Sequence, residues 1–357
     1  MPDTLTTRAL NRATLARQLL LRRSPLSPRD AIAHLGGMQA QAPLSPYTGL
    51  STRLENFNPE DLSTLISERH IVRAHLYRQT VHLLTAEDYL EFRPLFAHLG
   101  IRGVQAYYAK DLADAPIAEV PLLARTLLGG RALTRAELGK LLAQKWPKAS
   151  PSALAFTATS QLPVVQVPPR GLWGARGQVT VALAEDWLGR AAGDPAPEAV
   201  VRLVLRYLGA FGPATVSDIQ TWSGLTRLRE VTDRLELRAF RGQDGAVLLD
   251  LPEAPRPDPE TPAPPRFLPE YDNLLLSHTD RTRVIPHDRP VPLPPGNGST
   301  QGTLLIDGQW QATWKLTEGD VQIHPFVPLA PATREEIAAE AARLPALDSR
   351  PPEVRFP

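Results

Sequence analysis

The feature that most constrains the fold is an order of expected elements that occurs three times: helices followed by a β-hairpin. In the first copy, apolar residues at helical spacing predict helices at 8–23, 28–35 and 58–70. The alternating segment 71–84 then predicts two strands with a short turn. Three helices followed by a hairpin is the order of a winged helix. A unit that recurs along a chain favours an array of similar modules.

Capping residues support these boundaries in the first copy. Ser27 is a candidate N-cap followed by Pro28 at the first helical position, and Asn58 precedes acidic residues of a first helical turn. The second helix must end at Gly36-Gly37, because glycine is the usual residue just beyond a helix C-terminus.

The second and third copies share the pattern of the first rather than its sequence. Thr134 and Glu137 form a Thr-x-x-Glu capping box, and Asp244-Gly245 marks a hairpin turn. The second copy comprises expected helices at 121–128, 133–146 and 150–161 and expected strands at 164–167 and 178–183. The third copy comprises expected helices at 198–212, 214–224 and 226–235 and an expected hairpin at 237–251.

A proline-rich linker or extended strap, residues 253–266, follows these copies. Expected strands at 267–278, 302–316 and 320–329 then precede an amphipathic helix with Thr333 as its cap. We therefore predict an α+β fold of three tandem winged-helix modules braced by a small C-terminal β-barrel or sheet. The predicted domains are winged helix 1 at 1–115, winged helix 2 at 116–195, winged helix 3 at 196–252, and strap, β-barrel strands and C-terminal helix at 253–357.

Composition excludes several classes of protein. With 43% hydrophobic residues the chain can form cores, and without cysteine it has no disulfide, thiolate zinc site or cysteine-ligated iron–sulfur cluster. No segment reaches about 18 uninterrupted apolar residues, so we expect a cytoplasmic protein without membrane contact. The sequence has no phosphate-binding glycine loop and no dinucleotide fingerprint, and we expect neither a metal nor a cofactor.

Charge gives little indication of a partner. The formal net charge is +1, from 39 basic and 38 acidic side chains, so any nucleic-acid footprint must be local. One local excess exists in residues 1–30, which hold six arginines against two aspartates. This excess is either a solvated helix face or part of such a footprint.

A winged helix usually places its third helix in the DNA major groove and its hairpin on the backbone or minor groove. Three in one chain can line a concave surface, although many winged helices bind protein or only pack. The expected third helix of the second copy, residues 150–161, carries no positive charge. We therefore expect that module to act as a scaffold.

The most specific segment of the chain is FLPEYDNLLLSHTDRTRVIP, residues 267–286. Shorter distinctive segments are LGGMQAQAP, RQTVHLLTAEDY, RGLWG, GPATVSDIQTWSGL and LLIDGQWQATWKL. These segments resemble the winged helix DNA-binding domain-containing proteins, the AlkZ/YcaQ-type DNA glycosylases. The resemblance extends from about residue 9 to residue 345.

The resemblance implies three winged helices braced by a β-barrel around a basic DNA cleft, and an enzyme that removes alkylated purines, including bulky and cross-linked adducts. The catalytic Gln-x-Gln motif of the AlkZ-like branch maps onto Gln39 and Gln41, where the YcaQ-like branch has Gln-x-Asp. For the catalytic hairpin of the family, the tip at 168–177 is the first candidate and the loop at 288–302 is its rival.

The chemistry of two amides suits one kind of lesion. Glutamine takes no proton at neutral pH and is no general base. In extended backbone, which Gly36-Gly37 and Pro43 favour, side chains at i and i+2 point the same way and can hold one water. An N7-alkylated purine is cationic and departs neutral, so orientation and electrostatics suffice. Alternatively, Gln39 and Gln41 cap carbonyls at a helix end.

Further residues are candidates for contact with DNA. These are Arg73, Arg78, His82, Arg170, Trp173, Arg176, Arg281 and Arg283. The first three lie on the first hairpin and either contact phosphate or form an exposed strand face. Trp173 either wedges into DNA or packs onto the next module. The last two belong to a polar run with Asp272, Asn273 and His278, which we expect to be mainly structural, with some phosphate contact.

The sequence therefore predicts a monomeric, metal-independent, monofunctional DNA glycosylase, an N-glycosyl hydrolase for N7-substituted purines in double-stranded DNA, with interstrand cross-links as a further expected substrate. Base flipping stays open. The alternatives are a non-catalytic winged-helix DNA-binding protein or transcription regulator, which predicts a dimer with fixed half-site spacing, and a protein-interaction scaffold.

Overall fold

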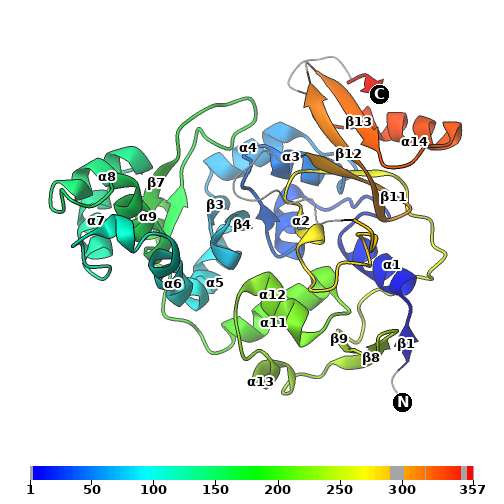
Figure 1. Ribbon diagram of the computed structural model, residues 1–357, viewed down its shortest axis with the longest axis horizontal. Coiled ribbons are helices and arrows are strands. Elements are labelled where there is room, and N and C mark those ends of the chain that lie inside the picture. The colour runs from blue at the N-terminus through cyan, green and yellow to red at the C-terminus, as the bar shows by residue number, and fades with distance from the viewer. Residues whose placement is uncertain (1–2, 290–300, 318, 347–351, 357) are drawn as a thin grey trace. The chain divides into compact units, whose positions relative to one another are not determined.

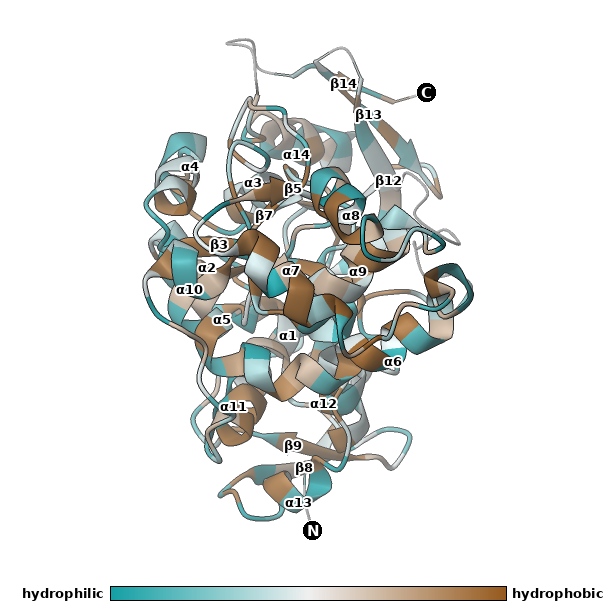
Figure 2. Ribbon diagram, turned by 90° about the vertical axis from the view of Figure 1, so that its left-hand side faces the viewer, coloured by the Kyte–Doolittle hydropathy of each residue, from teal (hydrophilic) through white to brown (hydrophobic). Residues whose placement is uncertain are grey.

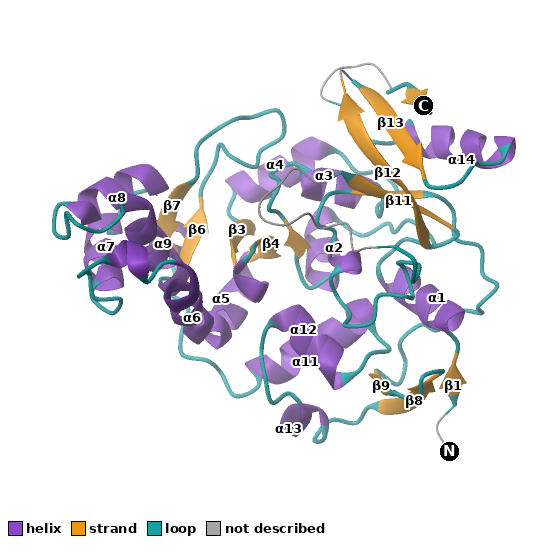
Figure 3. Ribbon diagram, viewed as in Figure 1, coloured by secondary structure: helices purple, strands orange, loops and turns teal. Residues whose placement is uncertain are grey.

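The computed structural model describes residues 3–289, 301–317, 319–346 and 352–356 of the 357-residue chain (Figure 1). It divides into two compact units. The first unit combines Met1–Asp61 with Leu203–Pro357, and the second unit is Leu62–Arg202. Helices and strands contribute to both units (Figure 3), which confirms the predicted α+β class. The winged-helix modules and their boundaries stay a prediction.

Side-chain caps start several helices of the first unit, as the sequence predicts for Ser27, whose hydroxyl accepts from the N–H of Asp30. The unit boundaries fall inside α4 and α11. The helices that lie wholly or partly in the first unit are α1 (Thr7–Arg17), α2 (Pro28–His34), α3 (Ser45–Ser51), α4 (Pro59–Ser67), α11 (Ala199–Phe211), α12 (Val216–Ser223), α13 (Arg229–Thr232) and α14 (Pro331–Ala341).

Two sheets support the first unit. In the smaller sheet, in the order β1-β8-β9, β1 runs parallel to β8. The larger sheet has the order β10-β11-β12-β13-β14, and its β11–β12 turn contains Asp307 and Gly308, both with positive φ. The strands are β1 (Thr4–Leu5), β8 (Arg238–Gly242), β9 (Val247–Asp250), β10 (Arg266–Leu268), β11 (Gly302–Ile306), β12 (Gln309–Thr317), β13 (Asp320–Pro325) and β14 (Val354–Arg355).

The second unit packs helices around strands in the order β4-β3-β6-β7-β5. Helix α7 is mostly apolar (Figure 2), and its Ala124 and Leu128 are buried in the core of this unit. The strands are β3 (Ile71–His75), β4 (Val81–Thr85), β5 (Leu133–Thr134), β6 (Val164–Gln166) and β7 (Thr180–Leu183). The helices are α5 (Ala86–Phe92), α6 (Ala97–Tyr107), α7 (Val120–Leu128), α8 (Arg135–Ala143), α9 (Pro151–Gln161) and α10 (Ala184–Leu188).

The prediction of a strand over 267–278 is wrong beyond Leu268. Tyr271 has a φ of +61°, and a 3-10 turn follows at Asn273–Leu275. Asp272 stabilises this turn because its carboxylate accepts the N–H of Leu274 at 3.0 Å. The apolar run that suggested a strand instead lies in the core, where Leu274 and Leu275 pack together with residues of α1.

Other predicted boundaries are also corrected. The helix expected at 8–23 ends at Arg17, and Leu19 has a φ of +58°. The helix expected at 226–235 is reduced to Arg229–Thr232. The last helix is preceded by Ala330 and has Pro331 in its first turn, so Thr333 is not its cap.

Two of the six arginines near the N-terminus are buried and form contacts within the first unit. Arg17 and Asp250 are fully buried and 2.6 Å apart, and Arg17 also donates to the carbonyl of Leu208. Arg12, 1% exposed, donates to the carboxylate of Asp307. A solvated helix face is therefore wrong for these two arginines, which tie α1 to β9 and to the β11–β12 turn.

Candidate functional site

The Gln-x-Gln segment begins where α2 ends. The N–H groups of Gly36 and Gly37 close the helix on carbonyls of its last turn, and both glycines have positive φ, +68° and +94°. A Cβ at Gly36 would lie 3.4 Å from a side-chain carbon of Arg206, so this glycine also permits close packing. Met38–Gln39 follow as the extended strand β2, whereas Gln41 lies in a bend, so the predicted extended backbone is confirmed at Gln39 but not at Gln41.

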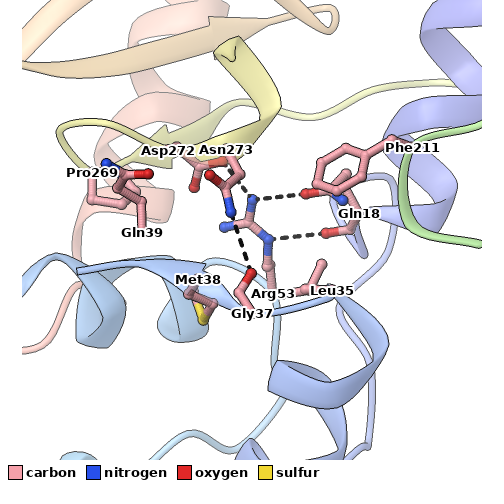
Figure 4. A pocket seen from close by; sticks show the side chains of 10 residues that line it. All are labelled: Gln18, Leu35, Gly37, Met38, Gln39, Arg53, Phe211, Pro269, Asp272 and Asn273. Carbon is pink, nitrogen blue, oxygen red and sulfur yellow. Dashed lines mark hydrogen bonds and ion pairs between the residues drawn. The ribbon is translucent and has the colours of Figure 1, made fainter. Parts of the chain in front are cut away.

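The two glutamines differ in environment. Gln39 is only 7% exposed, whereas Gln41 is exposed and lies in a bend before α3. Gln39 lines a small cavity of the first unit, shown in Figure 4. The cavity volume is about 10 Å³, room for about one water molecule. Its lining residues are Gln18, Leu35, Gly37, Met38, Gln39, Arg53, Phe211, Pro269, Asp272 and Asn273.

A buried guanidinium organises this cavity (Figure 4). Arg53, 2% exposed, donates to the carboxylate of Asp272 at 2.9 Å and to the carbonyl of Gly49 at 3.0 Å. It also donates to the carbonyl and side-chain oxygens of Gln18, at 3.1 and 3.4 Å. Arg53 thereby joins the end of α1, helix α3 and the segment after β10 behind the Gln-x-Gln motif.

The segment Glu270–Asn273 holds the motif from both sides. The Asn273 amide donates to the carbonyl of Gly37 at 3.3 Å, two residues before Gln39. The hydroxyl of Ser45, four residues after Gln41, donates to the carboxylate of Glu270 at 2.9 Å. The loop that carries both glutamines is therefore fixed at its beginning and its end by one short segment of the C-terminal half.

Replacing Arg53 by methionine is expected to lower the free energy of unfolding by about 3–5 kcal/mol, because the Asp272 carboxylate would stay buried without its cation. Urea unfolding measures this loss. An additional Asp272→Asn change should recover part of it.

The matched control is Lys148→Met, since Lys148 is 78% exposed and its pair with Asp114 is worth about 0–1 kcal/mol. An Arg53→Met loss as small as that of the control would contradict the organising role of the guanidinium.

Two predicted DNA contacts of the second unit are buried. Arg73, 3% exposed, donates to the side-chain oxygen of Gln166, and a Cβ on Gly171 would lie 3.2 Å from its Cδ. His82 is fully buried, with its Nδ1 3.0 Å from the carbonyl of Thr80. Both phosphate contact and an exposed strand face are therefore wrong for these residues. Gln166 and Gly171 pack against Arg73, and the ring of Tyr77 packs against His82.

Burial decides the protonation of His82. Desolvation, followed by repulsion from Arg78, lowers the pKa of His82 to about 3. The imidazole lies edge-on to Tyr77 with ring centroids 5.0 Å apart. His82 is thus a neutral core residue at neutral pH.

This neutral histidine predicts a loss of stability in acid. Between pH 6.5 and about 3 the unfolded chain binds a proton at His82 that the folded chain does not, so the free energy of unfolding falls as pH falls through this window. The His82 contribution is roughly 1.4 kcal/mol per pH unit, and His82→Phe should flatten the acid dependence by that slope. Urea unfolding at several pH values measures this slope.

His70→Phe, at a side chain 55% exposed, is the control. Parallel pH curves for His82→Phe and wild type would refute the assignment of the slope to His82.

The other predicted contacts of the second unit are more accessible. Arg78 and Gln79, at the tip of the β3–β4 hairpin, both have positive φ, +51° and +59°. This backbone conformation is strained for residues other than glycine. Arg176 is exposed, and Arg170 is half-buried. Trp173 is half-buried, and its N–H donates to the hydroxyl of Ser63 at 2.9 Å, which favours packing onto α4.

In the first unit, the polar run around His278 is mainly structural, as predicted. His278 is 1% exposed, and its Nε2 lies 3.0 Å from the carbonyl of Phe211. Arg283, 6% exposed, donates to Thr14 and to the carbonyl of Pro213, so its predicted phosphate contact is wrong. Arg281 is half-buried and keeps an accessible part.

Sequence reasoning missed several contributors to the site. It did not consider Arg53 or Glu270, and it placed Asn273 only in a polar run expected to be mainly structural, because Glu270 and Asn273 fall in a segment expected to be a strand. The available signal was the polar cluster Glu270-Tyr271-Asp272-Asn273 directly after an apolar strand. The rival hairpin, 288–302, lies largely outside the described residues.

Within the described ranges, no group of three or more His, Cys, Asp or Glu side chains is arranged to hold a metal ion. Those ranges also contain no helix with the length and apolar character needed to cross a bilayer.

Three comparisons relate the chain to known proteins. The family model described as "DNA glycosylase AlkZ-like" matches residues 32–347. The interstrand DNA cross-link repair glycosylase of Streptomyces sahachiroi is 24% identical over 355 residues, covering 92% of this chain and 93% of that protein. The solved structure of Streptomyces sahachiroi DNA glycosylase AlkZ has a TM-score of 0.73 at 19% identity, covering 99% of this chain and 100% of that chain. The structural match shows a shared fold.

Proposed function

Because the chain belongs to the AlkZ-like DNA glycosylase family, we propose that it hydrolyses the N-glycosidic bond of N7-alkylated, cationic purines in double-stranded DNA. The observation that supports this proposal best is the position of Gln39, in extended backbone directly after a helix and at a cavity for about one water molecule.

The proposed reaction uses the different environments of the two amides. Gln39 is buried and held in place, so it orients the attacking water, while the exposed Gln41 contacts the sugar. Water adds to C1′ of the deoxyribose, and the bond electrons leave with the purine nitrogen, which neutralises the cationic base. Such a leaving group needs no prior protonation, so orientation and electrostatic stabilisation account for the rate.

The fold-level proposal is that three winged-helix modules, at 1–115, 116–195 and 196–252, present accessible side chains to DNA and that residues 253–357 brace them. The candidates for DNA contact that stay accessible are Arg78, Arg170, Trp173, Arg176 and Arg281. We propose that the protein acts as a monomer and, by similarity to the Streptomyces sahachiroi cross-link repair glycosylase, also acts on interstrand cross-links.

Replacement of either glutamine tests the proposal. Gln39→Ala and Gln41→Ala should each slow release of N7-methylguanine from duplex DNA on the order of 100-fold, because each removes a positioned hydrogen-bonding group. Single-turnover assays with excess enzyme measure the rate, and fluorescence anisotropy measures DNA affinity, which should not change.

Gln144→Ala, at an exposed glutamine that ends α8, is the control and should retain full activity. Wild-type protein that binds DNA but releases no base, from N7-methylguanine or from a bulkier N7 adduct, would instead support a non-catalytic DNA-binding protein.

The amide pair also predicts selectivity by leaving group. Matched duplexes with N7-methylguanine and with uncharged hypoxanthine should differ in release rate by on the order of 100-fold or more, because nothing in an amide pair can protonate the uncharged base. Equal rates on both substrates would exclude a mechanism that relies on a cationic base.

A further inference from the structure

The proposed function leaves one chemical role without a residue. Hydrolysis at C1′ creates positive charge on the sugar and releases a proton from the attacking water, and amides neither carry negative charge nor accept that proton. The role requires an anionic side chain beside the Gln-x-Gln segment. The segment that holds this loop contains two carboxylates, Glu270 and Asp272.

Asp272 is already committed to the structure. It is 5% exposed, its carboxylate accepts from Arg53 at 2.9 Å, and it caps the following turn through the N–H of Leu274. Both contacts hold this carboxylate inside the protein. Asp272 therefore orders the site.

Glu270 is placed differently. It is half-buried, it forms no ion pair among the described residues, and its Oε2 accepts a hydrogen bond from the Ser45 hydroxyl at 2.9 Å. Its neighbour Pro269 lines the same cavity as Gln39 (Figure 4). Consecutive Cα atoms are about 3.8 Å apart, so Glu270 lies one residue from the cavity and beside the helix that follows Gln41.

The backbone at this position is strained. Tyr271, between the two carboxylates, has a φ of +61°, a conformation that is strained for a residue with a side chain and is concentrated at functional sites. This turn separates the roles of its neighbours: Asp272 pairs with Arg53, and Glu270 reaches Ser45 at the start of α3.

We propose that Glu270 is a catalytic residue whose carboxylate stabilises the oxocarbenium-like sugar and accepts the proton of the attacking water. The inference rests on the proposed glycosylase function. The C1′–N bond breaks with its electron pair going to the purine, the water oxygen bonds to C1′, and the water proton passes to Glu270 and then to solvent. The cationic purine leaves as a neutral base, so charge and atoms balance.

The test compares wild type with Glu270→Gln, which keeps an oxygen that can accept from Ser45, and with Glu270→Ala. Single-turnover release of N7-methylguanine is expected to fall on the order of 100-fold in both variants at unchanged DNA affinity and melting temperature. Glu253→Gln, at an exposed glutamate of the first unit, should match wild type.

Azide separates catalysis from structure, because this small anionic nucleophile attacks C1′ without losing a proton. Sodium azide should raise the rate of Glu270→Ala in proportion to its concentration and leave the wild-type rate unchanged. A Glu270→Gln rate within twofold of wild type overturns the proposal, and so does a loss in both variants that azide does not relieve. An inactive wild type would overturn the glycosylase function itself, which distinguishes the two failures.

Discussion

The candidate site depends on one buried guanidinium. Arg53 donates to Asp272, to Gln18 and to the carbonyl of Gly49, and so satisfies its own charge and the charge of Asp272 at once. A buried cation of this kind is tolerated only where every donor has a partner. Three separate pieces of the first unit must therefore assemble around it before the Gln-x-Gln segment has a fixed position.

Other buried polar contacts also join distant parts of the first unit. Arg17 joins α1 to β9 through fully buried Asp250, and Asn273 joins the C-terminal half to the carbonyl of Gly37. In each case a polar side chain from one part of the sequence satisfies a buried group from another. The arginines near the N-terminus, which suggested nucleic acid in the sequence, serve in part as these internal ties.

Much of the local structure could be predicted from the sequence, because it depends on neighbouring residues. Ser27 caps α2, Thr134 and Glu137 form the capping box of α8, and Gly36-Gly37 end a helix. The extended backbone at Gln39 follows from the same signals. Burial could not be predicted in this way, because it depends on distant contacts. Hairpin residues such as His82 have the alternating pattern of a half-exposed strand, yet His82 is fully buried.

The discontinuous first unit has a consequence for the order of assembly during synthesis. Residues 62–202 form a compact unit by themselves and leave the ribosome before Asp272, Asn273 and Glu270 have been translated. The Gln-x-Gln segment emerges early but lacks the side chains that hold it until three-quarters of the chain exists. A nascent or prematurely terminated chain that ends before Glu270 therefore carries both glutamines in an unassembled site.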